Sequence, residues 1–198
     1  SIGDLESKAI YMAQISEDKE DIQAVVSPDL GMSLVGFTLG HTQILQNSRK
    51  DDFARGRKGL GPLILPHFNQ RKRVPTFSIE PEEIFDHIDY LKRNGVDDPF
   101  QHGIGRYVPW QYSTETKKDR VCVTCFISGS DEVSDDVQLS DITGFDFQAS
   151  VTYTLTERNL HIDFDVRGAQ PIACGIHYYY ALPDPEHSSV TMSVEEIG

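Results

Sequence analysis

The sequence has few cysteines, no long apolar segment and a shortage of basic residues. Three cysteines in 198 residues is an odd, low count that fits a reducing compartment better than a disulfide framework. No apolar run approaches the roughly 20 residues that span a bilayer. The N-terminus lacks the pattern of a signal peptide, so we expect a soluble, cytoplasmic protein. With 18 Lys and Arg against 31 Asp and Glu, the net charge of −13 disfavours nucleic acid and anionic membranes as partners.

What the sequence does have is alternation of apolar and polar residues, which is typical of half-buried strands. Residues Gly144–Thr156 alternate in this way, and after a short polar break so do Leu160–Val166. Two such runs predict an antiparallel hairpin with one face in water. Further strands are expected at Ala9–Ile15, Ile22–Ser27, Ser33–Leu39, Thr42–Leu45, Arg120–Ser128, Pro171–Leu182 and Ser188–Val194.

Only Glu80–Arg93 has a helical period, with Pro81 in its first turn and Gly95 after its end. Polar, charged or glycine-rich composition predicts loops at Asn47–Gly61, Thr114–Asp119 and Ser128–Gln138. Many short strands separated by turns favour an all-β fold. We therefore predict one domain over residues 1–198, a β-sandwich with one short helix.

The segment Gln101–Trp110 concentrates groups that bind ligands. It contains an imidazole (His102), a guanidinium (Arg106), an indole (Trp110) and two glycines. Glycines allow a ligand to approach the backbone, Arg offers a planar set of donors, and Trp offers a face against which a sugar ring can stack. The same composition fits an ordinary loop in which Trp110 fills the core and His102 is hydrogen-bonded.

Two other segments carry candidate groups. In Cys174–Pro183, a strand would place His177 and Tyr179 on one face, and a histidine there could act as an acid or base near neutral pH. A structural histidine fits the same pattern. In Gly61–Arg73, an apolar run ends in an Asn and three basic residues, which is either a local cationic site or a solvated strand end.

The sequence gives little support for a metal site. Cys122 and Cys125 have the spacing C-x-x-C, but in a strand this offset places the two sulfurs on opposite faces. The acidic segment Asp131–Asp136 lacks the glycine and terminal glutamate of a calcium loop. His102 and His177 have no third ligand at a clear spacing. We expect no metal.

The motif H-G-x-x-R-x-x-P-W at His102–Trp110 resembles a signature of the aldose 1-epimerase (galactose mutarotase) superfamily. Three further segments are similar to family motifs in the family's order: Gly61–Arg73, Phe147–Val166 and Gly175–Tyr179. The resemblance runs from about residue 22 to residue 183. It implies a β-sandwich of the galactose-mutarotase type that binds a hexose or hexose phosphate.

The resemblance also implies a reaction and a set of residues. Family members interconvert sugar anomers by acid/base ring opening, without a metal or an organic cofactor. His177 matches the general acid, and His102 matches the histidine that contacts the sugar near its ring oxygen. Arg71 lies at or beside the substrate-binding arginine. The expected substrate-binding positions are Asn69, Arg71, Arg106, Trp110 and Tyr179.

The chain also departs from the family pattern. Tyr178 stands where the family has a proline, and the family's catalytic Glu comes from a portion well beyond the second histidine motif. The acidic residues after His177 match no family motif, so we expect that the C-terminal portion of the family is lacking. Three alternatives follow: an aldose 1-epimerase, a hexose-6-phosphate 1-epimerase, or a carbohydrate-binding protein that has lost the base.

Overall fold

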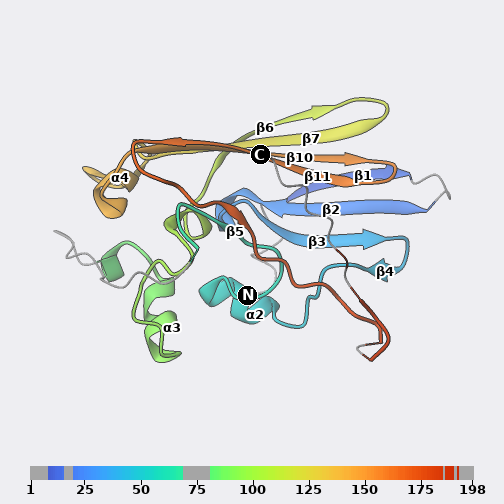
Figure 1. Ribbon diagram of the computed structural model, residues 1–198, viewed down its shortest axis with the longest axis horizontal. Coiled ribbons are helices and arrows are strands. Elements are labelled where there is room, and N and C mark those ends of the chain that lie inside the picture. Colours follow the sequence, from blue (N-terminus) through green and yellow to red (C-terminus); the bar gives the residue numbers. More distant parts are fainter. Residues whose placement is uncertain (1–8, 16–19, 69–80, 185, 190, 192–198) are drawn as a thin grey trace.

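The computed structural model describes residues 9–15, 20–68, 81–184, 186–189 and 191, and it contains two four-stranded antiparallel sheets. The first sheet has the order β1-β2-β3-β4, with bounds Ile10–Ile15, Asp21–Ser27, Ser33–Leu39 and Thr42–Gln43. The second has the order β11-β10-β7-β6, with bounds Leu160–Gly168, Phe147–Thr156, Arg120–Ser128 and Gln111–Thr116. The sheets lie one above the other (Figure 1). The predicted β-sandwich is confirmed.

Alternation decides which side of the second sheet is buried. In β10, the odd-numbered residues from Phe147 to Leu155 are buried, whereas the even-numbered residues are partly or fully exposed. The same period continues in β7, where Val123 and Cys125 point inward toward the first sheet. β10 pairs with β7 on one side and with β11 on the other. The predicted antiparallel hairpin of β10 and β11 is therefore confirmed, with its polar face exposed to solvent.

The prediction of one helix and of a loop at Asn47–Gly61 is wrong. Within the described residues there are three short α-helices: α2 at Lys50–Gly56, α3 at His87–Arg93 and α4 at Leu139–Thr143. The helix expected at Glu80–Arg93 forms as a 3-10 turn, η2 at Pro81–Glu83, followed by α3. Helix α2 forms in a polar segment because Phe53 is buried in the core, a tertiary effect that its composition hides.

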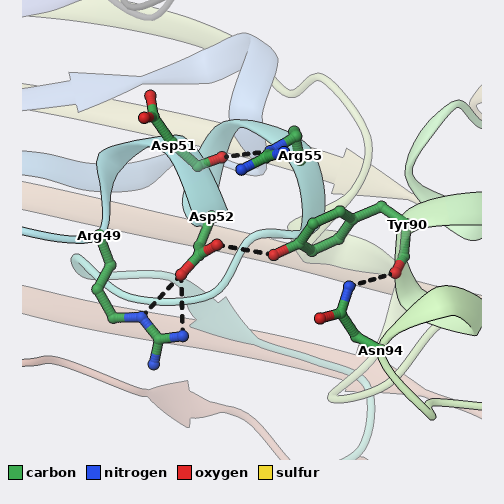
Figure 2. A network of polar contacts seen from close by, with 6 residues as sticks. All are labelled: Arg49, Asp51, Asp52, Arg55, Tyr90 and Asn94. Carbon is green, nitrogen blue, oxygen red and sulfur yellow. Dashed lines mark hydrogen bonds and ion pairs between the residues drawn. The ribbon is translucent and has the colours of Figure 1, made fainter.

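A polar network joins α2 to α3. The Tyr90 hydroxyl donates to Asp52 Oδ1 at 2.8 Å, and Arg49 pairs with Asp52 Oδ2 at 2.9 Å (Figure 2). The pKa of the Asp52 carboxyl is lowered, first by the Tyr90 hydrogen bond and then by Arg49. The Tyr90 ring packs directly on Gly56, where a Cβ would come within 2.4 Å of it, so only a glycine of α2 leaves room for this ring of α3.

Smaller elements differ from the other loop and strand predictions. Strand β6 extends into the loop expected at Thr114–Asp119, and β8 (Glu132–Ser134) pairs with β9 (Val137–Gln138) inside the loop expected at Ser128–Gln138. Of the strand expected at Pro171–Leu182, only β12 (Gly175–Ile176) forms, paired with β5 (Leu63–Ile64), apart from one bridge between Leu45 and Tyr180. The strand expected at Ser188–Val194 falls mostly outside the described residues.

Two further 3-10 turns connect these parts: η1 at Pro28–Leu30 and η3 at Ile104–Arg106. Within the described ranges, none of the helices has the length and apolar character needed to cross a membrane.

Candidate functional site

Two histidines from distant parts of the sequence face each other. The ring centroids of His102 and His177 are 5.4 Å apart, with the planes tilted by 38°. The Tyr179 ring lies next to His177, with a centroid distance of 5.1 Å. All three side chains are partly exposed. The structure thus brings together three of the residues that the sequence predicts for the site.

His177 and Tyr179 are held by the strand pairing that begins at β12. The backbone N–H of His177 donates to the Pro62 carbonyl at 3.0 Å, and that of Tyr179 donates to the Leu60 carbonyl at 2.9 Å. This alternating pattern fixes the backbone of the segment and turns the two side chains to the same side. The position of His177 therefore depends on the Leu60–Ile64 segment, which precedes it by more than a hundred residues.

His102 is held in the turn that leads into η3. Its backbone is left-handed (φ 65°), and Nδ1 donates a hydrogen bond to the Phe68 carbonyl. A carbonyl only accepts, so the bond fixes the proton on Nδ1 and leaves Nε2 as the acceptor of the neutral ring. The pKa of His102 is lowered, mainly by burial and further by the charges of Arg106 and His177. His102 is therefore mostly neutral at pH 7.

Glycines let this turn lie directly on the end of β5. Gly103 has a φ of 92°, and any side chain there would overlap the Leu65 carbonyl. Two residues later, the Gly105 N–H donates to that same carbonyl at 3.2 Å. The glycines therefore act by bringing the His102 turn against the backbone of residues 65 and 66, which is what places His102 opposite His177.

Arg106 is buried close to His102 and Tyr179. Its side chain is 4% exposed, it donates from Nη2 to the Arg57 carbonyl, and it lies over the Tyr107 ring. Its Nε is buried without a hydrogen-bond partner, and no described carboxylate pairs with it. Burial lowers the pKa of its guanidinium. In this position, the positive charge of Arg106 lowers the pKa of His102.

Trp110 supports the site from inside the core. It is 4% exposed, and its Nε1 donates to the Gly105 carbonyl at 2.8 Å. The interpretation in which Trp110 fills the core fits this position, and the indole holds the His102 turn in place. The remaining predicted site residues, Asn69 and Arg71, lie outside the described residues.

Sequence reasoning missed two charged groups: Asp98, whose charge acts on His102, and Arg57, which lies next to Arg106. Asp98 is buried, accepts the Phe100 N–H at 2.9 Å, and its charge raises the pKa of His102. Arg57 is largely buried beside Arg106, and burial lowers its pKa to about 10. Both lie in segments without a recognisable motif, so only packing could have identified them. Across the described ranges, no group of three or more His, Cys, Asp or Glu residues has the geometry of a metal site.

The chain is similar to known proteins in sequence and in fold. The family model described as aldose 1-epimerase matches residues 83–197. The Slr1438 protein from Synechocystis sp. PCC 6803 has a similar structure, with a TM-score of 0.60 and 16% identity over 87% of this chain and 54% of that one. A galactose mutarotase-like protein from Clostridium acetobutylicum also has a similar structure, with a TM-score of 0.57. The two sequences are 17% identical, and the match covers 91% of this chain and 56% of that one.

These two structures support the fold alone, and this chain spans about half of their length. A comparison with curated protein sequences finds no match. The family model covers more than half of the chain, including both histidine motifs. This chain therefore belongs to the aldose 1-epimerase family.

Proposed function

We propose that the chain binds a hexose at the His102–His177 pair and that this pair serves an aldose 1-epimerase reaction. The observation that carries the proposal is the 5.4 Å separation of the two rings, which belong to two separate family-like motifs. Both rings are partly exposed, so a sugar can reach them. Tyr179 adds an aromatic surface beside His177.

The surroundings of His102 favour its neutral form. Two imidazolium ions at this distance repel each other, so the protonated state of one ring disfavours that of the other. His102 is the ring whose pKa is lowered, and its Nδ1 proton is engaged by the Phe68 carbonyl. We therefore assign the acid that protonates the ring oxygen to His177, and the neutral hydrogen-bonding role to His102.

Ring opening also needs a base that takes the proton from the C1 hydroxyl. Among the described residues, no carboxylate forms a hydrogen bond or ion pair with His177. Asp98 is the carboxylate whose charge acts on His102, but it is buried and accepts a backbone N–H. This arrangement keeps the alternative of a carbohydrate-binding protein without catalysis as a second candidate.

The test is the rate of anomer interconversion of fresh α-glucose and α-galactose, followed by polarimetry or NMR. We expect the chain to accelerate it, and His177→Ala to lower the acceleration by about 10²- to 10⁴-fold, the usual contribution of a positioned acid. His161→Ala, an exposed histidine on β11, is the matched control and should change nothing. A loss below tenfold in His177→Ala would contradict the assigned role.

Binding without catalysis gives a different result. A non-catalytic carbohydrate-binding protein would be stabilised by the sugar against thermal unfolding, since a ligand of the native state shifts the equilibrium. It would leave the rate of anomerisation at its uncatalysed value. The two measurements together separate the candidates.

A phosphorylated hexose is favoured by one specific observation. Arg106 is 4% exposed, and its guanidinium pairs with no described carboxylate. Buried cations without a counter-charge are costly, and an anionic substrate nearby would offset that cost. Stronger thermal protection by glucose 6-phosphate than by glucose would support this candidate. Equal protection by both sugars would remove it.

A further inference from the structure

The second sheet has a hollow on its outer face that shares no residue with the His102–His177 site. It has a volume of about 310 Å³ and lies over β6, β7, β10 and β11. The pairing register places Gln111, Phe126, Ser150 and Asp165 in one row across these four strands. Ser128, Gln148 and Arg167 form the next row.

Phe126 is out of place on this face. It is 46% exposed, although its neighbours in β7, Cys125 and Ile127, are buried on the other side of the sheet. Its outward register neighbours on the described strands, Gln111, Ser128 and Ser150, are polar. An aromatic ring that is left in water beside a hollow is available to stack on the apolar face of a ligand.

The groups around the ring are planar or small, and most of them both donate and accept hydrogen bonds. Gln111 and Gln148 contribute amides, and Ser128 and Ser150 contribute hydroxyls. The Arg167 guanidinium is held flat against Asp165 by contacts of 3.3 and 3.1 Å. The opposite charges of this exposed pair nearly cancel.

The combination selects one class of ligand. A sugar ring presents C–H groups on one face, which suit Phe126, and hydroxyls around its edge, which both donate and accept. Asp131 and Asp165 outnumber the single cation Arg167 in the hollow, which disfavours phosphates and other anions. A single exposed ring is too little apolar surface for a lipid or an amphipathic helix.

We propose that this hollow is a second carbohydrate-binding site, for a neutral mono- or disaccharide unit such as the end of an oligosaccharide. Phe126 stacks on the sugar, and Gln111, Gln148 and the Asp165–Arg167 pair contact its hydroxyls. The site binds without chemistry and does not depend on the proposed anomerisation. Its volume lies at the lower end of the ~300–1,000 Å³ range of ligand pockets, which favours one or two sugar rings.

The experiment is a titration with maltose, cellobiose and lactose, monitored by backbone and side-chain amide NMR. At least one of these sugars should shift the Gln111 and Gln148 side-chain amides together with backbone amides near Phe126, at millimolar concentration. Phe126→Ala should weaken this binding at least tenfold without altering anomerisation. Tyr112→Ala is the matched control, because it removes an equally exposed aromatic ring of β6 that lies on the other face of the sheet.

Two outcomes would overturn the proposal: no shift on the outer face with any of the three sugars, or unchanged binding in both Phe126→Ala and Gln148→Ala. The double variant His102→Ala/His177→Ala keeps the two sites apart. It should retain the shifts on the outer face while losing any that arise at the histidine pair. Failure of the proposed anomerisation would leave this result unaffected.

Discussion

His87 is a histidine that the fold keeps neutral. Its ring stacks on Tyr107 with a centroid distance of 3.9 Å and an angle of 13°, and its Nε2–H donates to the Pro99 carbonyl at 2.7 Å. Burial lowers the pKa of His87 to about 4. Since the unfolded chain takes up the proton near pH 6.5, protonation favours unfolding at acid pH.

The first prediction concerns this residue and the pH dependence of stability. The contribution of neutral His87 is complete above about pH 6.5 and is lost as the pH falls from there toward 4. Lowering the pH from 7.5 to 5.0 should therefore reduce the free energy of unfolding by about 2 kcal/mol through this residue. The measurement is urea unfolding at both pH values. His87→Phe keeps an aromatic ring without a titrating group. The free energy of unfolding of this variant should therefore fall between pH 7.5 and 5.0 by about 2 kcal/mol less than that of the unmodified protein. An equal fall in both proteins would contradict the assignment.

At the scale of elements, β10 ties the two halves of the described chain together. It lies between β7 and β11, and its buried Tyr153 donates from the hydroxyl to the Met32 carbonyl at 2.8 Å. This bond joins the second sheet to the turn between η1 and β3, across 121 residues of sequence. The turn also holds the His102 segment, because the Gly31 N–H donates to the Val108 carbonyl at 3.1 Å.

The second prediction is that Tyr153→Phe destabilises the protein by about 1–2 kcal/mol. The ring remains packed, but the buried Met32 carbonyl loses its donor. Chemical unfolding at pH 7.5 measures the change. Thr152→Val on the outer face of the same strand is the control: its hydroxyl interacts with Thr124 at 3.2 Å but is partly exposed, so its loss should cost less. A smaller effect of Tyr153→Phe than of Thr152→Val would contradict the role given to the buried bond.

At the scale of the whole molecule, the net charge of −13 opposes compactness. The surface ion pairs of the described residues, such as Arg93 with Asp89 at 3.8 Å and Arg120 with Asp119 at 3.8 Å, are exposed and contribute little. The balance of surface electrostatics is therefore repulsive.

The third prediction follows from this balance. Raising NaCl from about 0.01 to 0.15 M shortens the screening length from about 30 to 8 Å, so the melting temperature at pH 7.5 should rise. Differential scanning calorimetry measures it. Near the pI of about 4.8 the net repulsion is small and the same salt change should have little effect. A melting temperature that falls with salt at pH 7.5 would show that attractive ion pairs dominate instead.

The half-buried strands can be predicted from the amino-acid sequence alone. In β7, β10 and β11, one face lies in the core and the other is exposed to water. This requires apolar and polar residues to alternate along the strand, a pattern that is visible in consecutive residues. The motifs also identified His102 and His177 as candidates, because their neighbours form recognisable patterns. Helix α2 was missed because its stability comes from burying Phe53 among residues distant in sequence.

The positions of the candidate residues relative to one another depend on contacts between distant parts of the chain. The separation of the two histidine rings depends on the β5–β12 pairing and on Gly103 lying against Leu65, contacts between segments far apart along the chain. The same is true of Trp110 and Arg106, which the fold buries next to the His102 turn, and of Asp98, which no motif marks. Local patterns specify which face of an element is buried, whereas distances between elements are set by how their side chains pack.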